Sequence, residues 1–124
     1  MGKVFGIHKI VLNPGVDEKE FEKFMAEAMP QTVWFEGWKV HFCKGDRGEG
    51  IGEYVILYEL ESVEARNRYS PAPNTNSEEA EGFSESLTEE QRKASQTIGE
   101  KFATFSSADP NAIYTDWVSI ASSK

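Results

Sequence analysis

The sequence predicts an α+β fold of the ferredoxin-like class, with four antiparallel strands and helices on one face of the sheet. Three observations predict it. Segments rich in β-branched and aromatic residues alternate with amphipathic segments in the order β-α-β-β-α-(α)-β. The length of 124 residues suits one domain, 1–124. The hydrophobic content of 39% is enough for a single core.

The first strand and the first helix are predicted by local signals. Residues 4–12 are dense in apolar and β-branched types, and an Asn-Pro-Gly turn follows them. Asp17 and Glu20 then form a D-x-x-E capping box before apolar residues that recur every three or four positions. We expect a helix over about 18–29, ended by Pro30.

The next part of the chain predicts a hairpin and a short helix. Residues 37–44 and 53–60 alternate like strands, and the glycine-rich segment 45–52 joins them. Ser62 follows the second of these strands and can cap a short helix that ends at about Tyr69.

An acidic helical insertion is expected around residues 70–107. Its first part is polar, with a short helix possible after Ser77. A T-x-x-Q capping box at 88–91 then begins a helix that runs to about Phe105. After a turn, residues 112–121 predict the last strand.

Both faces of the predicted sheet are apolar near its middle. On the third strand, Tyr54, Ile56 and Tyr58 alternate with Val55 and Leu57. Helices on one side can cover only one of these faces. We therefore expect a homodimer through the sheet face opposite the helices, since most soluble oligomers are symmetric homodimers. The alternative is a long loop that folds over the second face.

Charge and composition argue against several classes of protein. The balance of 13 Lys and Arg against 21 Asp and Glu gives a formal net charge of −8, which disfavours nucleic acid and anionic membrane surfaces as partners. No apolar run is long enough to span a bilayer, and the first residues lack a signal-peptide pattern, so a cytoplasmic location is expected. The single cysteine, Cys43, and two histidines predict neither a metal site nor a cofactor.

Two segments resemble a known family. HKIVLNPGVDEKEFEKF (8–24) and YVILYELESVEARNRYSPAP (54–73) resemble the stress-responsive dimeric α/β-barrel (Dabb) family. The resemblance implies a homodimer whose two sheets pack into a barrel. It also implies a small-molecule pocket between each sheet and its own helices.

The resemblance also implies site residues. A polyketide cyclase of that family uses a first-strand His, a last-strand Asp and a Tyr, which His8, Asp116 and Tyr69 resemble. The second His of that enzyme, its general base, falls near Pro73 and is absent here. This departure puts the cyclase reaction in doubt.

The residue types themselves fit a pocket with polar anchors, although each has a simpler structural explanation. His8 shares a strand face with Ile10, and a hydrogen bond to Asp116 is possible if the first and last strands are neighbours. It could equally be a core histidine. Tyr54, Tyr58 and Tyr69 could direct hydroxyls into the pocket or simply pack. Phe24 and Ile56 are expected to form its wall, a role that sequence cannot distinguish from core packing.

The functional prediction is binding of a small, mainly apolar molecule between the sheet and the helices. Fatty-acid-like, polyketide and aromatic ligands all fit. The alternative is a cofactor-free enzyme of the cyclase or monooxygenase type that uses His8, Asp116 and Tyr69. A third possibility is a dimer with a filled core and no ligand site.

Overall fold

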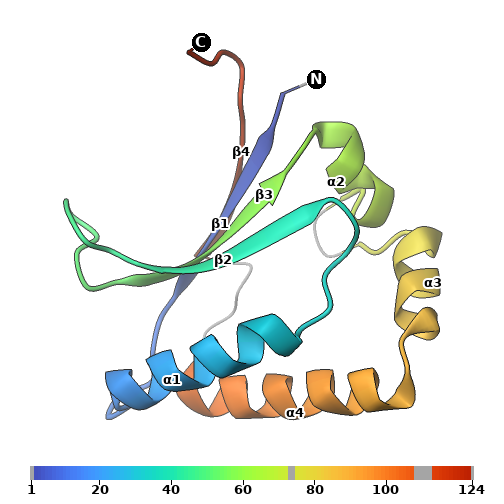
Figure 1. Ribbon diagram of the computed structural model, residues 1–124. Coiled ribbons are helices and arrows are strands. Elements are labelled where there is room, and N and C mark those ends of the chain that lie inside the picture. Colours follow the sequence, from blue (N-terminus) through green and yellow to red (C-terminus); the bar gives the residue numbers. More distant parts are fainter. Residues whose placement is uncertain (1, 73–74, 108–112, 124) are drawn as a thin grey trace.

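The computed structural model describes residues 2–72, 75–107 and 113–123 and has an α+β architecture (Figure 1). In chain order, its elements are β1 (Val4–Ile10), α1 (Glu18–Ala28), the 3-10 turn η1 (Met29–Gln31), β2 (Trp38–Lys44), β3 (Tyr54–Leu60), α2 (Val63–Tyr69), α3 (Glu78–Ser86), α4 (Glu89–Phe105) and β4 (Tyr114–Val118).

The four strands form one antiparallel sheet in the order β2-β3-β1-β4. The predicted succession of four strands and the antiparallel sheet are confirmed, but the described residues form three helices between β3 and β4 where the predicted order had one or two. The strand order is compatible with the ferredoxin-like class. The register sets His8 of β1 opposite Ile56 of β3 and Tyr114 of β4. Because directly opposite residues share a sheet face, these three side chains lie on the same side.

The predicted helix starts are confirmed by side-chain caps. Asp17 accepts hydrogen bonds from the backbone N–H groups of Lys19 (2.9 Å) and Glu20 (3.3 Å). Ser62 caps α2 by accepting from the N–H of Ala65, at 3.0 Å. At α4, both hydrogen bonds of the predicted T-x-x-Q capping box are present. These caps satisfy N–H groups that have no partner within the helix.

Some predicted boundaries differ from the structure. The first strand ends at Ile10 rather than residue 12, and α1 gives way to η1 at Met29. The last strand was expected over 112–121 but is Tyr114–Val118, while the turn before it and Pro73 lie outside the described residues. Segment ends depend on tertiary hydrogen bonds that local patterns do not specify.

The segment 70–107 contributes two helices with different positions. Ser77 caps α3, which lies beside α2 (Figure 1). Helix α4 lies alongside α1 on the same face of the sheet (Figure 1). Phe102 and Phe105 of α4 pack into the main core. The expected insertion therefore supplies half of the main helix layer.

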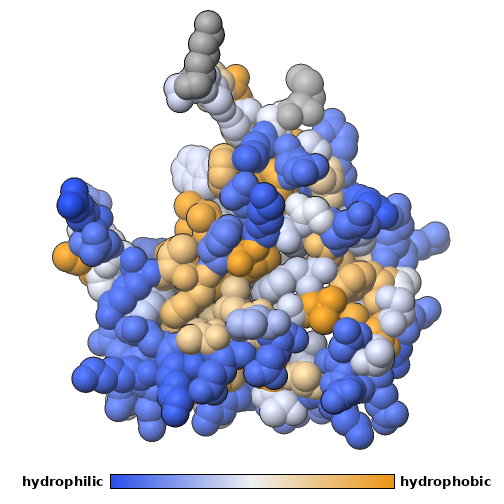
Figure 2. Space-filling model, viewed as in Figure 1, coloured by the Kyte–Doolittle hydropathy of each residue, from blue (hydrophilic) through white to orange (hydrophobic). Residues whose placement is uncertain are grey.

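The core lies between the sheet and these two helices, around one fully buried phenylalanine. Phe21 of α1 is 0% exposed. Its ring meets Tyr54 at 5.2 Å and Phe42 at 5.6 Å, both from the sheet, and Phe105 of α4 at 5.3 Å, measured between ring centroids. Edge-to-face and tilted rings at these separations attract one another in addition to burying apolar area. In the same view, hydrophilic residues cover the outer side of α1, and apolar residues gather where β2 crosses above it (Figure 2).

The opposite face of the sheet has no helix over it within the described residues (Figure 1). Phe5, Ile7, Val55 and Leu57 are half-buried there, and Trp117 is 60% exposed. The expectation that the helices cover only one of two apolar faces is confirmed. Among the described helices, none is both long and apolar enough to cross a membrane.

We expect Phe21→Ala to lower the free energy of unfolding by about 3–5 kcal/mol, because it leaves a cavity where four rings meet. Urea denaturation followed by circular dichroism measures the change. Val11→Ala is the control, since Val11 is 53% exposed and its truncation should change stability by less than about 0.5 kcal/mol. A loss at Phe21 no larger than that at Val11 would contradict the packing described.

Candidate functional site

A cavity of about 640 Å³ lies between the sheet and α2, beside the main core. Ligand sites are typically concave, mostly apolar and roughly 300–1,000 Å³ in volume. Most of the described residues in its lining are aromatic or apolar, and they include one acidic and one basic residue. The lining comprises Trp34, Phe35, Trp38, Tyr58, Leu60, Arg66, Ser70, Pro71, Ala72, Tyr114 and Asp116.

A glycine in the middle of β1 shapes the sheet beside this cavity. Gly6 lies directly between Tyr58 of β3 and Asp116 of β4 in the register. A Cβ at Gly6 would lie 2.2 Å from the hydroxyl oxygen of Tyr114 and 3.0 Å from Oδ1 of Asp116. The missing side chain therefore lets Tyr114 lean across β1 until its ring lies 5.9 Å from that of Tyr58.

Aromatic rings form the walls. Tyr58 meets Trp34 edge-on, with ring centroids 6.0 Å apart, and Trp38 similarly at 6.3 Å. Phe35 stacks on Tyr69 with centroids 4.4 Å apart and planes 11° from parallel. Tyr69 thus supports the wall from behind, and the cavity is lined by large, rigid, apolar surfaces.

One end of the cavity is polar. Arg66 of α2 donates from Nη1 to Oδ2 of Asp116 at 3.2 Å, and both side chains are 26% exposed. The Tyr114 hydroxyl donates to Oδ1 of the same carboxylate. Burial and the neighbouring Asp116 carboxylate raise the pKa of Tyr114, so its hydroxyl stays protonated and able to donate.

The polar groups of Trp38 and Tyr58 in the lining have no hydrogen-bond partner among the described residues. The indole Nε1 of Trp38 is buried and unpaired. The hydroxyl of Tyr58 forms no hydrogen bond with them either, and burial raises its pKa. Nε1 of Trp38 has almost no accessible surface, so a molecule in the cavity does not reach it, whereas the Tyr58 hydroxyl is not among the fully buried unpaired groups and can bind such a molecule.

The predicted site residues divide into two groups. Tyr58 and Asp116 line the cavity. His8 shares their sheet face, between Ile56 of the core and Tyr114 of the cavity wall. Burial lowers the pKa of its imidazole. The His8–Asp116 hydrogen bond is absent from the described residues, because Asp116 faces Gly6 in the register and its carboxylate contacts Arg66 and Tyr114 instead.

The other predicted site residues pack elsewhere. Tyr69 is 4% exposed and lies within the aromatic cluster behind the cavity. Ile56 and Tyr54 belong to the main core, and Phe24 packs against it. None of the three lines the cavity. Alternation along a strand indicates a face, but it does not indicate how far along that face the helices reach.

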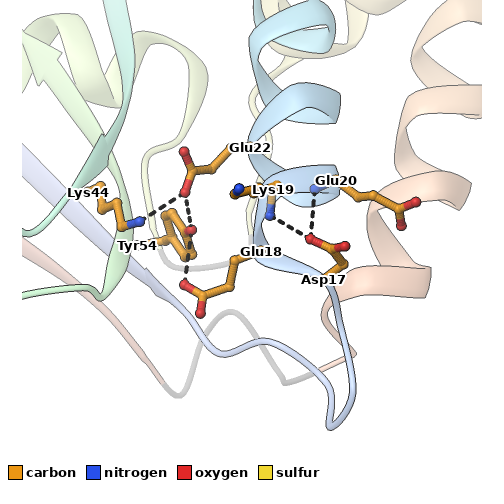
Figure 3. A network of polar contacts seen from close by, with 7 residues as sticks. All are labelled: Asp17, Glu18, Lys19, Glu20, Glu22, Lys44 and Tyr54. Atoms are coloured by element: carbon orange, nitrogen blue, oxygen red, sulfur yellow. Dashed lines mark hydrogen bonds and ion pairs between the residues drawn. The ribbon is translucent and has the colours of Figure 1, made fainter.

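The hydroxyl of Tyr54 lies at the opposite end of the sheet from the cavity, in a network of charged residues (Figure 3). It donates to Oε2 of Glu22 at 2.5 Å and lies 3.2 Å from Oε1 of Glu18. Lys44 donates to the same Glu22 oxygen at 3.0 Å. The hydrogen bonds from Tyr54 and Lys44 lower the pKa of the Glu22 carboxyl. This network joins α1 to the sheet.

Sequence reasoning missed several residues of the site, among them Gly6, Arg66, Tyr114, Trp34, Phe35 and Trp38. One signal for Gly6 was present, because a glycine inside a strand indicates a bulge or a close approach by another group. Arg66 gave no such signal. Its partner Asp116 is 50 residues away in the sequence, and an arginine on a short helix is ordinarily a surface residue.

No protein-family model matches the chain, and no curated protein or solved structure matches it either. The fold is therefore established by its own topology. Membership of the dimeric α/β-barrel family stays a prediction. Within the described residues, no group of three or more His, Cys, Asp and Glu side chains is placed to hold a metal ion.

We expect Glu22→Gln to destabilise the protein at pH 7 by removing the carboxylate that accepts from Tyr54 and Lys44. Because folding lowers the Glu22 pKa below its usual 4.5, the carboxylate's contribution is present above that pH and is lost as the pH falls through the lowered value. The difference in urea midpoint between variant and wild type should narrow from pH 7 to about pH 3.

Glu27→Gln is the matched control, since Glu27 lies on the same helix and its exposed carboxylate has no partner in the described structure. Its urea midpoint should follow that of wild type at both pH values. A Glu22→Gln effect that stays constant between pH 7 and pH 3 would contradict the role assigned to the carboxylate.

Proposed function

We propose that this protein binds a small, mainly apolar molecule in the cavity between its sheet and α2. The supporting observation is the cavity itself, a space of about 640 Å³ with aromatic walls and one polar end. The ligand classes that suit such a cavity are fatty-acid-like, polyketide and aromatic molecules. Planar aromatic molecules fit best, because rings from Trp34, Trp38 and Tyr58 offer flat surfaces for stacking.

The resemblance to the dimeric α/β-barrel family supports the same function, since it implies a small-molecule pocket in this position. The catalytic alternative needs His8 and Asp116 to act together. Their side chains make no hydrogen bond, and Asp116 is engaged by Arg66 and Tyr114. We therefore propose binding rather than catalysis.

We also propose that the protein is a homodimer joined through the uncovered sheet face. The centre of this face is apolar, with Phe5, Ile7, Val55 and Leu57, and its periphery carries charges. Glu59, for example, pairs with Lys3 at 3.2 Å and lies 3.9 Å from the imidazole of His41. An apolar centre with a polar rim is the usual arrangement of a protein interface.

The cavity can be tested with its own tryptophans. The chain has three, and Trp117→Phe leaves only Trp34 and Trp38, both in the cavity lining. We expect N-phenyl-1-naphthylamine, an uncharged aromatic probe, to quench the fluorescence of Trp34 and Trp38 by energy transfer in a saturable titration. Adding Tyr58→Ala should raise the dissociation constant measured in the same titration, because the substitution removes a wall residue of the cavity. Quenching that never saturates would contradict the proposed function.

The dimer predicts the effect of a charge at the centre of the uncovered face. We expect Leu57→Asp to convert a species of about twice the chain mass of 13.9 kDa into a monomer, because an unpaired carboxylate would be buried at the interface. Native mass spectrometry and sedimentation velocity measure the mass. Val33→Asp is the control, since it adds the same charge at an exposed apolar residue outside the sheet. A monomeric wild-type protein would exclude the dimer.

A further inference from the structure

We propose that the molecule bound in this cavity carries a carboxylate or another oxyanion, which Arg66 recognises. This inference rests on the proposed binding function and specifies its ligand. Among the described residues that line the cavity, Arg66 carries the only basic side chain.

The guanidinium of Arg66 has donors to spare. It carries five N–H groups, and its contacts with described residues use two of its nitrogens. Nε donates to Oδ1 of Asn67 at 3.0 Å, and Nη1 donates to Oδ2 of Asp116 at 3.2 Å. These two contacts hold the guanidinium at the end of the cavity. Its remaining N–H groups are free to bind an acceptor that enters the cavity.

Tyr58 supplies a further donor in the lining. Its hydroxyl has no hydrogen-bond partner among the described residues and, because burial raises the pKa of Tyr58, it keeps its proton and can donate as well as accept. The indole Nε1 of Trp38 has almost no accessible surface, so a molecule in the cavity does not reach it. Each oxygen of Asp116 already accepts one hydrogen bond, from Arg66 and from Tyr114. The remaining N–H groups of Arg66 can only donate, and they therefore favour a ligand group that accepts hydrogen bonds.

Asp116 has two effects on such a ligand. Its hydrogen bond with Arg66 positions the guanidinium, and its negative charge opposes a second anion nearby. The polar end is therefore neutral overall before the ligand binds. An oxyanion is held by directed hydrogen bonds from Arg66 rather than by an excess of positive charge, which suits a chain whose net charge is −8.

The test compares two probes with the same ring system, in the Trp117→Phe background and in 0.15 M salt, where charges farther than about 8 Å away are screened. One probe is 1-anilinonaphthalene-8-sulfonate, which carries an oxyanion. The other is N-phenyl-1-naphthylamine, which does not. We expect Arg66→Gln to weaken binding of the sulfonate about tenfold, the usual effect of losing a hydrogen bond to a charged group. Binding of the uncharged probe should change less than twofold.

Arg68→Gln is the matched control, because it makes the same change on the same helix at an arginine that pairs with Glu79 instead of lining the cavity. Arg68→Gln should leave the dissociation constants of both probes within twofold of those measured for the Trp117→Phe protein. Equal weakening of both probes by Arg66→Gln, or weakening of neither, would overturn the assignment of an oxyanion while leaving the cavity as a binding site. Failure of both probes to quench Trp34 and Trp38 would overturn the binding function as well.

Asp116→Asn provides a second test if Arg66→Gln does not fold. The substitution keeps a side-chain oxygen for Arg66 and removes the opposing charge, so the sulfonate should bind more tightly relative to the uncharged probe. Weaker relative binding of the sulfonate would overturn the inference, because it would mean that the carboxylate, and not the guanidinium, is the group that the ligand contacts.

Discussion

The packing of Phe21 against the sheet is the interaction on which the rest of the structure depends. Its ring is fully buried among aromatic side chains from β2, β3 and α4, so it fixes both main helices to the end of the sheet that contains Tyr54 and Ile56. The residues at the other end, Tyr58 and Leu60, are left for α2 and the aromatic segment before β2 to cover. Large rings do not fill that space completely. A cavity beside a well-packed core is the result.

Tyrosines at the two ends of the same sheet face have different roles because their surroundings differ. At the core end, the hydroxyl of Tyr54 meets carboxylates of α1, and Lys44 completes a network that joins helix to sheet. At the cavity end, the hydroxyl of Tyr58 has no partner among the described residues, and Tyr114 is committed to Asp116. A satisfied tyrosine contributes to stability, whereas an unsatisfied one beside a cavity is available to a ligand.

The two faces of the sheet also differ. One face has its apolar residues covered by α1 and α4, and the other presents Phe5, Ile7 and Leu57 beside the exposed Trp117. The proposed dimer would cover the second face, and the cavity lies on the first. Assembly and ligand binding would therefore use opposite sides of the same four strands. A substitution on one face of the sheet can therefore test the dimer or the cavity without directly altering the residues of the other face.

The sequence by itself determined the order of the strands, the helix caps and the apolar character of both sheet faces. These features depend on residues within a few positions of one another, such as Asp17 with Glu20 or Val55 between Tyr54 and Ile56. For that reason the α+β class and the antiparallel sheet could be predicted. Of the predicted site residues, Tyr58 and Asp116 line the cavity, because alternation placed them on the helix-facing side.

Only the tertiary structure decided how the site is assembled. The strand register places Gly6 between Tyr58 and Asp116, and that register offsets His8 from Asp116 by two residues. The fold also brings Arg66 to Asp116 across 50 positions of sequence, and it places the ring of Tyr69 behind the cavity wall, stacked on Phe35. Such contacts depend on register and on where each helix ends along the sheet. Local periodicity cannot determine them, because the same alternation is compatible with any register shift of two residues.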